Sequence, residues 1–212
     1  IAAMGSKSAA KHIMAQAGVP LVPGYHGDDQ DPALLRRAAE EIGYPVLLKA
    51  TAGGGGKGMR QVWSTSEFDA ALVAARREAL ASFGDDRMLV EKFLGKSRHV
   101  EVQVFFDHLG NGIYLAERDC SVQRRYQKVV EVAPAMHLDP KIRKELCDAA
   151  VKLAKGIGYN NAGTVEFLYD MDQNDWFFIE MNPRIQVEHT VTECVTGIDL
   201  VRSQILIAQG ES

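Results

Sequence analysis

The chain has 212 residues, of which 46% are hydrophobic and 25% are charged, and its net charge is −4. This length allows one large domain or two small ones, and the composition is that of an ordinary globular protein. The negative charge argues against nucleic-acid binding as the main role, and no apolar run or leader sequence predicts a membrane segment or export. Three cysteines without metal-type spacing indicate reduced thiols inside a cell.

Hydrophobic periodicity and capping signals predict helices that alternate with short strands. In chain order, the expected helices are residues 6–17, 31–43, 64–82 and a segment that starts at 139. The expected strands are residues 45–50, 60–63, 88–94, 98–106, 113–117, 164–169 and 176–181. Ser64 and Glu67 have the spacing of a capping box at the start of the third helix. Because the strands follow one another as hairpins rather than in regular βαβ units, the predicted fold class is α+β.

One stretch, FIEMNPRIQVEHTVTE at residues 178–193, concentrates carboxylate, amide and guanidinium side chains. Upstream of it, TVEFLY and WFFIEM flank the polar run MDQND, which predicts a β-hairpin. If its loop is centred on Gln173, Glu166 faces Glu180 with Cβ atoms about 5 Å apart. Facing carboxylates destabilise a hairpin unless positive charge lies between them, and Mg²⁺ favours carboxylate and amide oxygens together with substrate phosphates. The alternative is a shifted register with both carboxylates in solvent.

The loop TAGGGGKG at residues 51–58 contains Gly53, Gly55 and Gly58 in the order G-x-G-x-x-G. A dinucleotide-binding fold needs a helix after this motif, whereas a strand is expected here. A Walker loop is excluded because Thr51 and Gly58 stand where its first Gly and its Ser/Thr belong. Consecutive glycines still let the backbone approach phosphate oxygens and suit a flap that closes over a nucleotide. A plain hairpin loop is the alternative.

Two further polar strings lie in strand regions. In RHVEVQVF the side chains of His99, Glu101 and Gln103 share one face, which fits either a site or a solvated outer face. In DCSVQRRYQKVVE, arginine and lysine side chains stand close to valines. Beside a metal and phosphate site this string favours anion binding, and alone it would form a solvated basic face.

The chain resembles the ATP-grasp core of biotin carboxylase through motifs in the same order: GGGGKGM, LVEKFL, RHVEVQVF, ERDCSVQRRYQKVVEVAPA, GTVEF and FIEMNPRIQVEHTVTE. This component is shared by acetyl-CoA, propionyl-CoA, methylcrotonyl-CoA and pyruvate carboxylases. The first half looks most like the acyl-CoA carboxylase alpha subunits, and the last third looks more like pyruvate carboxylase. The resemblance implies an ATP-grasp fold with a leading helix and linker at 1–21, a lid at 22–90 and a catalytic half at 91–212.

The resemblance also implies site residues. Contacts with the ATP phosphates fall on Lys7, Lys49, Gly55 and Gly56, and further nucleotide contacts fall on Glu91, Lys92, Leu94, His99 and Gln123. Within that set, the Glu91 carboxylate and the backbone of Lys92 and Leu94 match the adenine contacts. The metal ligands match Glu166, Glu180 and Asn182, and the bicarbonate site matches Lys128, Arg184, Gln186, Val187 and Glu188. Among the implied catalytic residues Lys128, Arg184 and Glu188, Glu188 matches the base that deprotonates bicarbonate and Arg184 the arginine that orients it.

The implied enzyme is an ATP-dependent ligase. Bicarbonate attacks the γ-phosphate of ATP to give carboxyphosphate, and biotin captures the resulting CO₂. The implied cofactors are ATP, Mg²⁺ or Mn²⁺, and biotin on a carrier domain, and the implied partners are bicarbonate, that carrier domain, a carboxyltransferase component and a second copy in a homo-oligomer. A cytoplasmic location follows, or the mitochondrial matrix in a eukaryote. The alternatives are a nucleotide-binding fragment without turnover and another ATP-grasp carboxylate–amine ligase.

Two features depart from the family pattern. Tyr126 stands where the family usually has a histidine that reaches the nucleotide ribose, and its hydroxyl can supply that ATP contact instead. Biotin carboxylases also carry domains before and after the matched stretch, and the later one contributes part of the biotin pocket. The chain, which begins IAAMGSK, is therefore expected to be the middle of a longer protein and not to carboxylate free biotin by itself.

Overall fold

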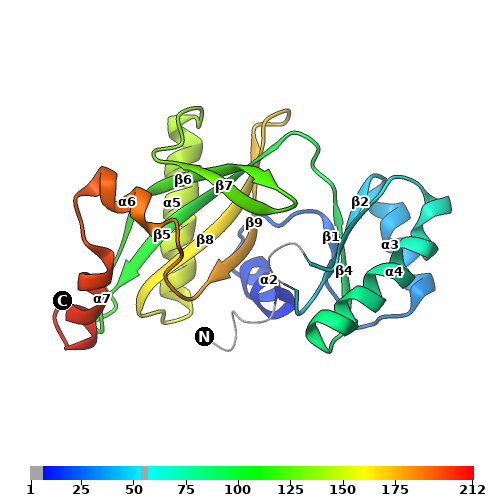
Figure 1. Ribbon diagram of the computed structural model, residues 1–212, viewed down its shortest axis with the longest axis horizontal. Coiled ribbons are helices and arrows are strands. Elements are labelled where there is room, and N and C mark those ends of the chain that lie inside the picture. The colour runs from blue at the N-terminus through cyan, green and yellow to red at the C-terminus, as the bar shows by residue number, and fades with distance from the viewer. Residues whose placement is uncertain (1–6, 54–56) are drawn as a thin grey trace.

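Two antiparallel sheets organise the computed structural model, which describes residues 7–53 and 57–212 (Figure 1). The smaller sheet has the strand order β1-β4-β2-β3, and the larger has the order β7-β6-β5-β8-β9. The strands of the smaller sheet are β1 (Gly24–Tyr25), β2 (Val46–Ala50), β3 (Met59–Val62) and β4 (Met88–Lys92). Those of the larger sheet are β5 (Ser97–Phe106), β6 (Gly112–Arg124), β7 (Gln127–Val132), β8 (Asn161–Asp170) and β9 (Asp175–Asn182). The hairpin arrangement confirms the expected α+β class.

The helices cover the sheets in two groups. They are α2 (Lys7–Gln16), α3 (Pro32–Ile42), α4 (Thr65–Phe83), α5 (Pro140–Gly156), α6 (His189–Thr196) and α7 (Leu200–Ala208). Helices α3 and α4 lie on the smaller sheet, and α5 packs against β5 and β6 of the larger one. None of the helices in the described ranges combines the length and the apolar character needed to cross a bilayer.

Each sheet has its own hydrophobic core. In β2 all five residues are buried, and alternation sends Val46, Leu48 and Ala50 toward α3 and α4. The intervening Leu47 and Lys49 therefore point to the opposite face of the smaller sheet. Glu91 pairs with Leu47 in the neighbouring strand and shares that face. The charged face of the smaller sheet is thus turned away from its helices.

Helix α2 belongs to the core of the larger sheet although it precedes the smaller sheet in the chain. Ala10 and Met14 are buried in the same cluster as the residues of β5, β8 and β9. The segment after the helix runs beside β9, where the Phe178 amide donates to the Pro20 carbonyl at 2.8 Å. Figure 1 shows α2 between the two sheets.

The β8–β9 hairpin confirms the predicted pairing of Glu166 with Glu180. Its loop geometry differs from the expectation, because Asp170 pairs with Asp175 and leaves a four-residue loop that is not centred on Gln173. The register then shifts by one residue between Glu166 and the next pair. This irregularity in β9 restores the facing pair, since a bulge inserts one extra residue into one strand.

Strand β6 is longer than the strand predicted at 113–117, and it forms an unpredicted hairpin with β7 through an unusual turn. Arg125 and Tyr126 connect the strands, and both have positive φ, at 51° and 65°. Two-residue hairpin turns of this kind favour Asn and Gly, because most side chains disfavour the left-handed region. Neither residue signals a turn, which is why the sequence predicted only a polar string here.

The helix caps agree with the sequence in two cases and differ in a third. The carboxylates of Asp31 and Asp139 accept hydrogen bonds from the first turns of α3 and α5, as expected. Ser64 makes no side-chain cap bond, so the predicted capping box is wrong. Glu67 instead accepts a hydrogen bond from the Trp63 amide at 3.0 Å, one residue before the expected donor.

Candidate active site

A row of three carboxylates crosses the larger sheet. Glu101 in β5 pairs with Glu166 in β8, and Glu166 pairs with Glu180 in β9. Glu101 is fully buried, as is Gln103 two residues further along the same face. The solvated outer face that the sequence left open for this string is therefore wrong. Three adjacent acidic side chains on neighbouring strands would repel one another, so cations must compensate them.

The first compensating cation is Arg118 in β6, which is directly paired with Glu101 and completely buried. Its Nε donates to Glu101 Oε1 at 2.6 Å. Its remaining donors reach the side chains of Gln103, Thr192 and Thr164, at 2.9, 2.8 and 3.4 Å. A buried guanidinium needs several acceptors to offset its lost hydration, and Arg118 has them.

The second cation is Lys128 in β7, and it joins three carboxylates. Its Nζ donates to Glu101 at 2.5 Å, to Glu188 at 2.5 Å and to Glu166 at 3.1 Å. Burial lowers the pKa of Lys128, but the charges of Glu166 and Glu101 outweigh burial and raise it above the ordinary 10.5. Lys128 is therefore a permanent cation at neutral pH, and it joins the predicted metal ligand Glu166 to the predicted base Glu188.

Glu166 is the most heavily contacted of the acidic residues. His99 Nε2 lies 2.9 Å from its carboxylate, and the side-chain amides of Asn182 and Gln186 donate to Oε1 at 2.9 and 3.0 Å. Burial raises the pKa of Glu166, but the hydrogen bond from His99 and the charges of His99 and Lys128 outweigh it and hold the pKa far below 4.5. The carboxylate is therefore ionised, which is the form that binds a metal.

Gln123 fixes the orientation of His99. Its side-chain nitrogen lies 2.9 Å from His99 Nδ1 and also donates to the Cys120 carbonyl at 2.7 Å. With Gln123 at Nδ1, the imidazole is oriented with its Nε2 toward Glu166. Two residues predicted as nucleotide contacts are thus held together and against the predicted metal ligand.

The donor set fits a divalent cation. Lys128 is shared by three carboxylates, and Arg118 contacts one of the same three, so the carboxylates outnumber these two permanent cations. Carboxylate and amide oxygens are also the ligands that Mg²⁺ prefers. Gln186 Oε1 is buried and has no hydrogen-bond partner among the residues that the structure describes, which leaves an acceptor for a further group at this point.

The remaining bicarbonate residues lie in the segment that connects β9 to α6. Glu188 is buried beside Lys128, whose hydrogen bond lowers the pKa of Glu188 against the opposing effect of burial. Arg184 is exposed, and its guanidinium donates to the Ile185 carbonyl at 3.1 Å and reaches Asn182 Oδ1 at 3.5 Å. The side chain of Val187 is 90% exposed. The structure therefore places an ionised carboxylate and a solvent-facing guanidinium on one short connection.

The predicted nucleotide residues of the smaller sheet gather around Glu91. The Lys49 ammonium lies 2.5 Å from the Glu91 carboxylate, which is fully buried. Lys92 directs its own ammonium to the carbonyls of Gly43 and Tyr44, and its amide donates to the Pro23 carbonyl at 2.8 Å. A backbone contact to adenine from Lys92 would therefore use its carbonyl. Leu94 is half-buried.

Part of the phosphate prediction lies outside the described residues. These are Gly55, Gly56 and the side chain of Lys7. The glycines on either side of the gap are described, and Gly58 has a positive φ of 68°. A Cβ there would lie 2.9 Å from that of Ala50, so both conformation and space favour glycine at this position.

Tyr126 lies at the tip of the β6–β7 hairpin, and it is 41% exposed. The side-chain amide of Gln61 in β3 donates to its hydroxyl at 3.5 Å. The hydroxyl that the resemblance assigns to the ribose therefore contacts the smaller sheet.

Three charged residues of these clusters are not among the predicted site residues. The alternation in RHVEVQVF is a sequence pattern that could have identified Glu101 as a site residue, but a solvated outer face gives the same pattern. Arg118 carries no signal, and neither does Lys11 of α2, which contacts the Glu91 carboxylate. A single basic residue in a strand or helix is usually exposed. Their burial follows from tertiary packing and is not visible in the local pattern.

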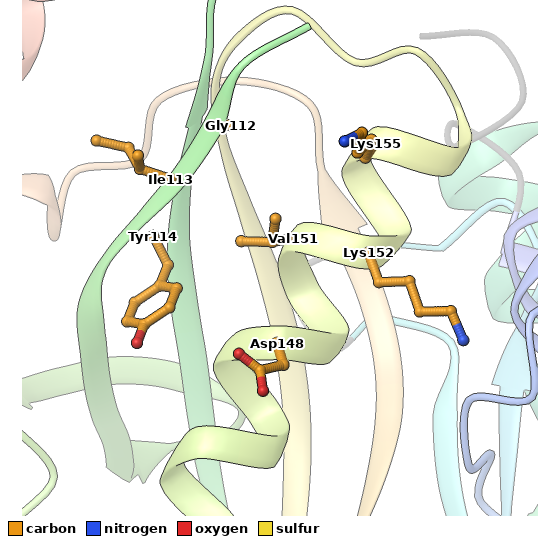
Figure 2. Close-up of a pocket in the computed structure, with 7 residues that line it drawn as sticks. All are labelled: Gly112, Ile113, Tyr114, Asp148, Val151, Lys152 and Lys155. Carbon is orange, nitrogen blue, oxygen red and sulfur yellow. The ribbon is translucent and has the colours of Figure 1, made fainter.

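A separate open hollow of about 530 Å³ lies between the start of β6 and α5 (Figure 2). Figure 2 shows Tyr114 on the strand and Val151 projecting from the helix toward it. None of the described residues that line it is a predicted site residue. The hollow is therefore distinct from the acidic cluster.

The arrangement of two antiparallel α+β halves around an acidic, lysine-bridged cluster is that of an ATP-grasp fold. Residues 6–212 match the family model for the carbamoyl-phosphate synthase L chain, ATP binding domain, and the chain belongs to this family. The resemblance to the biotin carboxylase core of acyl-CoA and pyruvate carboxylases is confirmed.

Individual relatives support this placement. The chain is 59% identical over 208 residues to the mitochondrial alpha subunit of methylcrotonoyl-CoA carboxylase from Rattus norvegicus, covering 98% of this chain and 29% of the rat chain. A biotin carboxylase structure from Campylobacter jejuni, solved as a β,γ-ATP complex, matches with a TM-score of 0.96 and 50% identity over 99% of this chain and 47% of that one.

A third related structure was solved with bound ligands. The biotin carboxylase domain dimer of 2-oxoglutarate carboxylase from Hydrogenobacter thermophilus was solved with MgADP, ADP and bicarbonate, and it matches with a TM-score of 0.95 and 50% identity over 99% of this chain and 46% of that one. The chain thus spans about a third of the curated relative and about half of each of these solved chains.

Proposed function

We propose that this chain binds ATP between its two halves and uses it to activate bicarbonate as carboxyphosphate for the carboxylation of biotin. Lys49 and the glycine loop hold the phosphates, with Lys7 as a further contact. The backbone of the strand-end segment from Glu91 to Leu94 holds the adenine, because the Glu91 carboxylate is fully buried on its lysine partners. This reaction is that of an ATP-dependent ligase.

The observation that carries this proposal is the position of Lys128. Its ammonium lies 3.1 Å from Glu166 and 2.5 Å from Glu188, so it joins the proposed metal ligand to the proposed base. A phosphoryl acceptor bound beside Glu166 and Glu188 would contact a cation, Lys128, and an ionised carboxylate, Glu188. Such fixed charges are what a phosphoryl transfer to bicarbonate requires.

Each residue has a distinct proposed task. Glu188 accepts the bicarbonate proton, and the hydrogen bond from Lys128 keeps it ionised beforehand. Arg184, Gln186 and the backbone of Val187 orient the bicarbonate. Glu166, Glu180 and the Asn182 amide oxygen hold Mg²⁺ or Mn²⁺, with His99 and Gln123 positioned behind Glu166. The bound metal would neutralise the negative charge of the phosphates.

The whole protein's partners follow from the same chemistry. Biotin on a carrier domain receives the carboxyl group, and a carboxyltransferase component consumes carboxybiotin. We also propose a homo-oligomer, in a bacterial cytoplasm or a eukaryotic mitochondrial matrix. The division at residues 21 and 90 into linker, lid and catalytic half is part of the proposal, and it is supported by the two separate cores.

The test is phosphate release from MgATP by the purified chain with and without bicarbonate. We expect release to depend on bicarbonate and to fall at least 100-fold in Glu188→Gln, a typical loss for a general base. Nucleotide binding without bicarbonate-dependent release would favour a fragment without turnover. Release that depends on an amine and a second carboxylate would instead indicate a carboxylate–amine ligase.

A further inference from the structure

A second buried charge cluster surrounds Glu91 in β4. Its carboxylate is fully buried and receives Lys49 Nζ at 2.5 Å on one oxygen. The ammonium of Lys11 and the His26 imidazole, with Nε2 at 3.0 Å, approach the other oxygen. Lys11 is itself 2% exposed. Among the described residues, two lysines of this cluster therefore form ion pairs with the same carboxylate.

The two lysines come from different halves of the molecule. Lys49 and Glu91 belong to the smaller sheet, on the face that is turned away from α3 and α4. Lys11 belongs to α2, whose Ala10 and Met14 are buried in the core of the larger sheet. Figure 1 shows α2 between the sheets. Lys11 therefore reaches across from the larger half to a carboxylate of the smaller one.

Glu91 is an ionised carboxylate with two lysine counterions. Burial raises the pKa of Glu91, but the charges of Lys49 and Lys11 outweigh it, so the carboxylate is ionised. Glu91 therefore keeps one lysine counterion if the other ammonium group turns to a different anion. Lys49 is the lysine placed for this, because β2 ends one residue later and leads into the glycine loop.

We propose that Lys11 is a positioning residue for nucleotide binding, which holds Glu91 so that Lys49 is available to the phosphates. When Lys49 turns to a phosphate, Glu91 loses one of its two counterions. A buried carboxylate left without a cation is strongly unfavourable, so Lys49 could leave only if Lys11 stays. This inference rests on the proposed nucleotide site, and it adds a residue outside the motifs that define that site.

The test compares Lys11→Met, which keeps the length of the side chain, with the parent chain and with Lys144→Met. Lys144 is an exposed lysine of α5, so its variant controls for the loss of a charge elsewhere. Binding of MgADP is measured by calorimetry, and binding of adenosine is measured by ligand-observed NMR. We expect Lys11→Met to weaken MgADP about tenfold and adenosine less than twofold, because adenosine has no phosphate for Lys49.

A double-mutant cycle shows whether Lys11 acts through Lys49. In a Lys49→Met background, Lys11→Met should change the MgADP affinity less than threefold, because the lysine that it positions is already gone. A Lys11→Arg variant should recover most of the loss. Equal weakening of MgADP and adenosine, or independent effects of the two substitutions, would overturn the proposal and indicate a purely structural lysine.

The native chain gives a second test if Lys11→Met does not fold. In a crystal structure with MgADP, Lys49 should contact phosphate and Lys11 should remain on Glu91. A complex in which Lys11 has left Glu91, or in which Lys49 has stayed there, would overturn the proposal. Failure of the parent chain to bind MgADP would instead contradict the proposed function, so the two failures are distinguishable.

Discussion

Glu166 and Glu180 occupy directly opposed positions on β8 and β9 although they carry the same charge. Their pairing depends on a register shift next to Glu166, so the hairpin is built to keep these two residues opposite each other. A facing acidic pair lowers the stability of a hairpin unless a cation compensates it. Lys128 and His99 compensate Glu166, and the two facing carboxylates supply the type of ligand that the proposed metal site needs.

The first prediction concerns this pair. Replacing Glu166 or Glu180 with Gln removes a proposed metal ligand, so MgATP should stabilise the variants much less than the parent chain. At a nucleotide concentration 100 times Kd, binding adds about 2.7 kcal/mol, and a 100-fold loss of affinity reduces this to about 0.4 kcal/mol. Thermal melts with and without MgATP measure the difference.

The controls for this prediction are an exposed substitution and a metal-free comparison. Glu40→Gln, on the outer side of α3, should keep the full MgATP shift. In EDTA the Glu180→Gln chain should be at least as stable as the parent, because one of two facing charges is gone. An unchanged MgATP shift in both site variants would refute the metal assignment.

The second prediction concerns Arg118. Replacing it with Leu leaves Glu101 buried with Lys128 as its remaining cation and leaves the neighbouring amide and hydroxyl groups with one donor fewer. We expect the free energy of unfolding to fall by about 3–5 kcal/mol, as when one partner of a buried pair is removed. Urea unfolding measures it.

A surface pair provides the comparison for Arg118. Arg87 contacts Asp85 at 2.7 Å but is half exposed, so Arg87→Leu should lower the free energy of unfolding by no more than about 1 kcal/mol. Equal losses in the two variants would show that the buried network around Glu101 contributes no more than an exposed pair does.

The sequence predicts most of the strands and the facing pair of Glu166 and Glu180, because these signals are local. The hairpin that holds Glu166 and Glu180 follows from β-rich runs around a polar loop, and the pairing was predicted although the assumed loop centre was wrong. The β6–β7 hairpin could not be predicted as well, because Arg125 and Tyr126 are not residues that favour a positive-φ turn.

The burial of charged side chains also could not be predicted from the sequence. Lys11 and Arg118 are buried because they form ion pairs with carboxylates from other parts of the chain, Lys11 with Glu91 and Arg118 with Glu101. No periodic pattern in the sequence indicates that Lys11 pairs with Glu91 or that Arg118 pairs with Glu101. In contrast, the alternation of the strands that contain Glu101 and Glu166 at least predicts which face of the sheet these two residues occupy. The residues that complete the charge balance therefore required the structure.

The third prediction concerns pH. Lys49 and Lys11 outweigh burial and hold the pKa of Glu91 well below 4.5. A carboxyl with a depressed pKa in the folded state contributes stability above its unfolded pKa, and that contribution is lost as pH falls toward the folded value. Below about pH 4.5 this group should therefore lower the stability of the parent chain by up to about 1.4 kcal/mol per pH unit.

The matched variant for the pH prediction is Glu91→Gln, which cannot take up this proton. It should be less stable than the parent at pH 7, and the two stability curves should converge as the pH falls from 4.5 to 3. Denaturant unfolding across that range measures both curves. Parallel curves would show that Glu91 does not contribute to the acid sensitivity of the fold.

The fourth prediction concerns the central claim that bicarbonate attacks ATP beside Lys128 and Glu188. The most direct measurement uses freshly dissolved ¹⁸O-bicarbonate with MgATP and follows the mass of the phosphate that the chain releases. If bicarbonate attacks the γ-phosphate, the oxygen that joins them remains on phosphorus when carboxyphosphate breaks down. We predict that released phosphate carries one ¹⁸O and that Glu188→Gln abolishes this signal. Unlabelled phosphate, released at the same rate with and without bicarbonate, would mean that water is the acceptor and would contradict the proposed reaction.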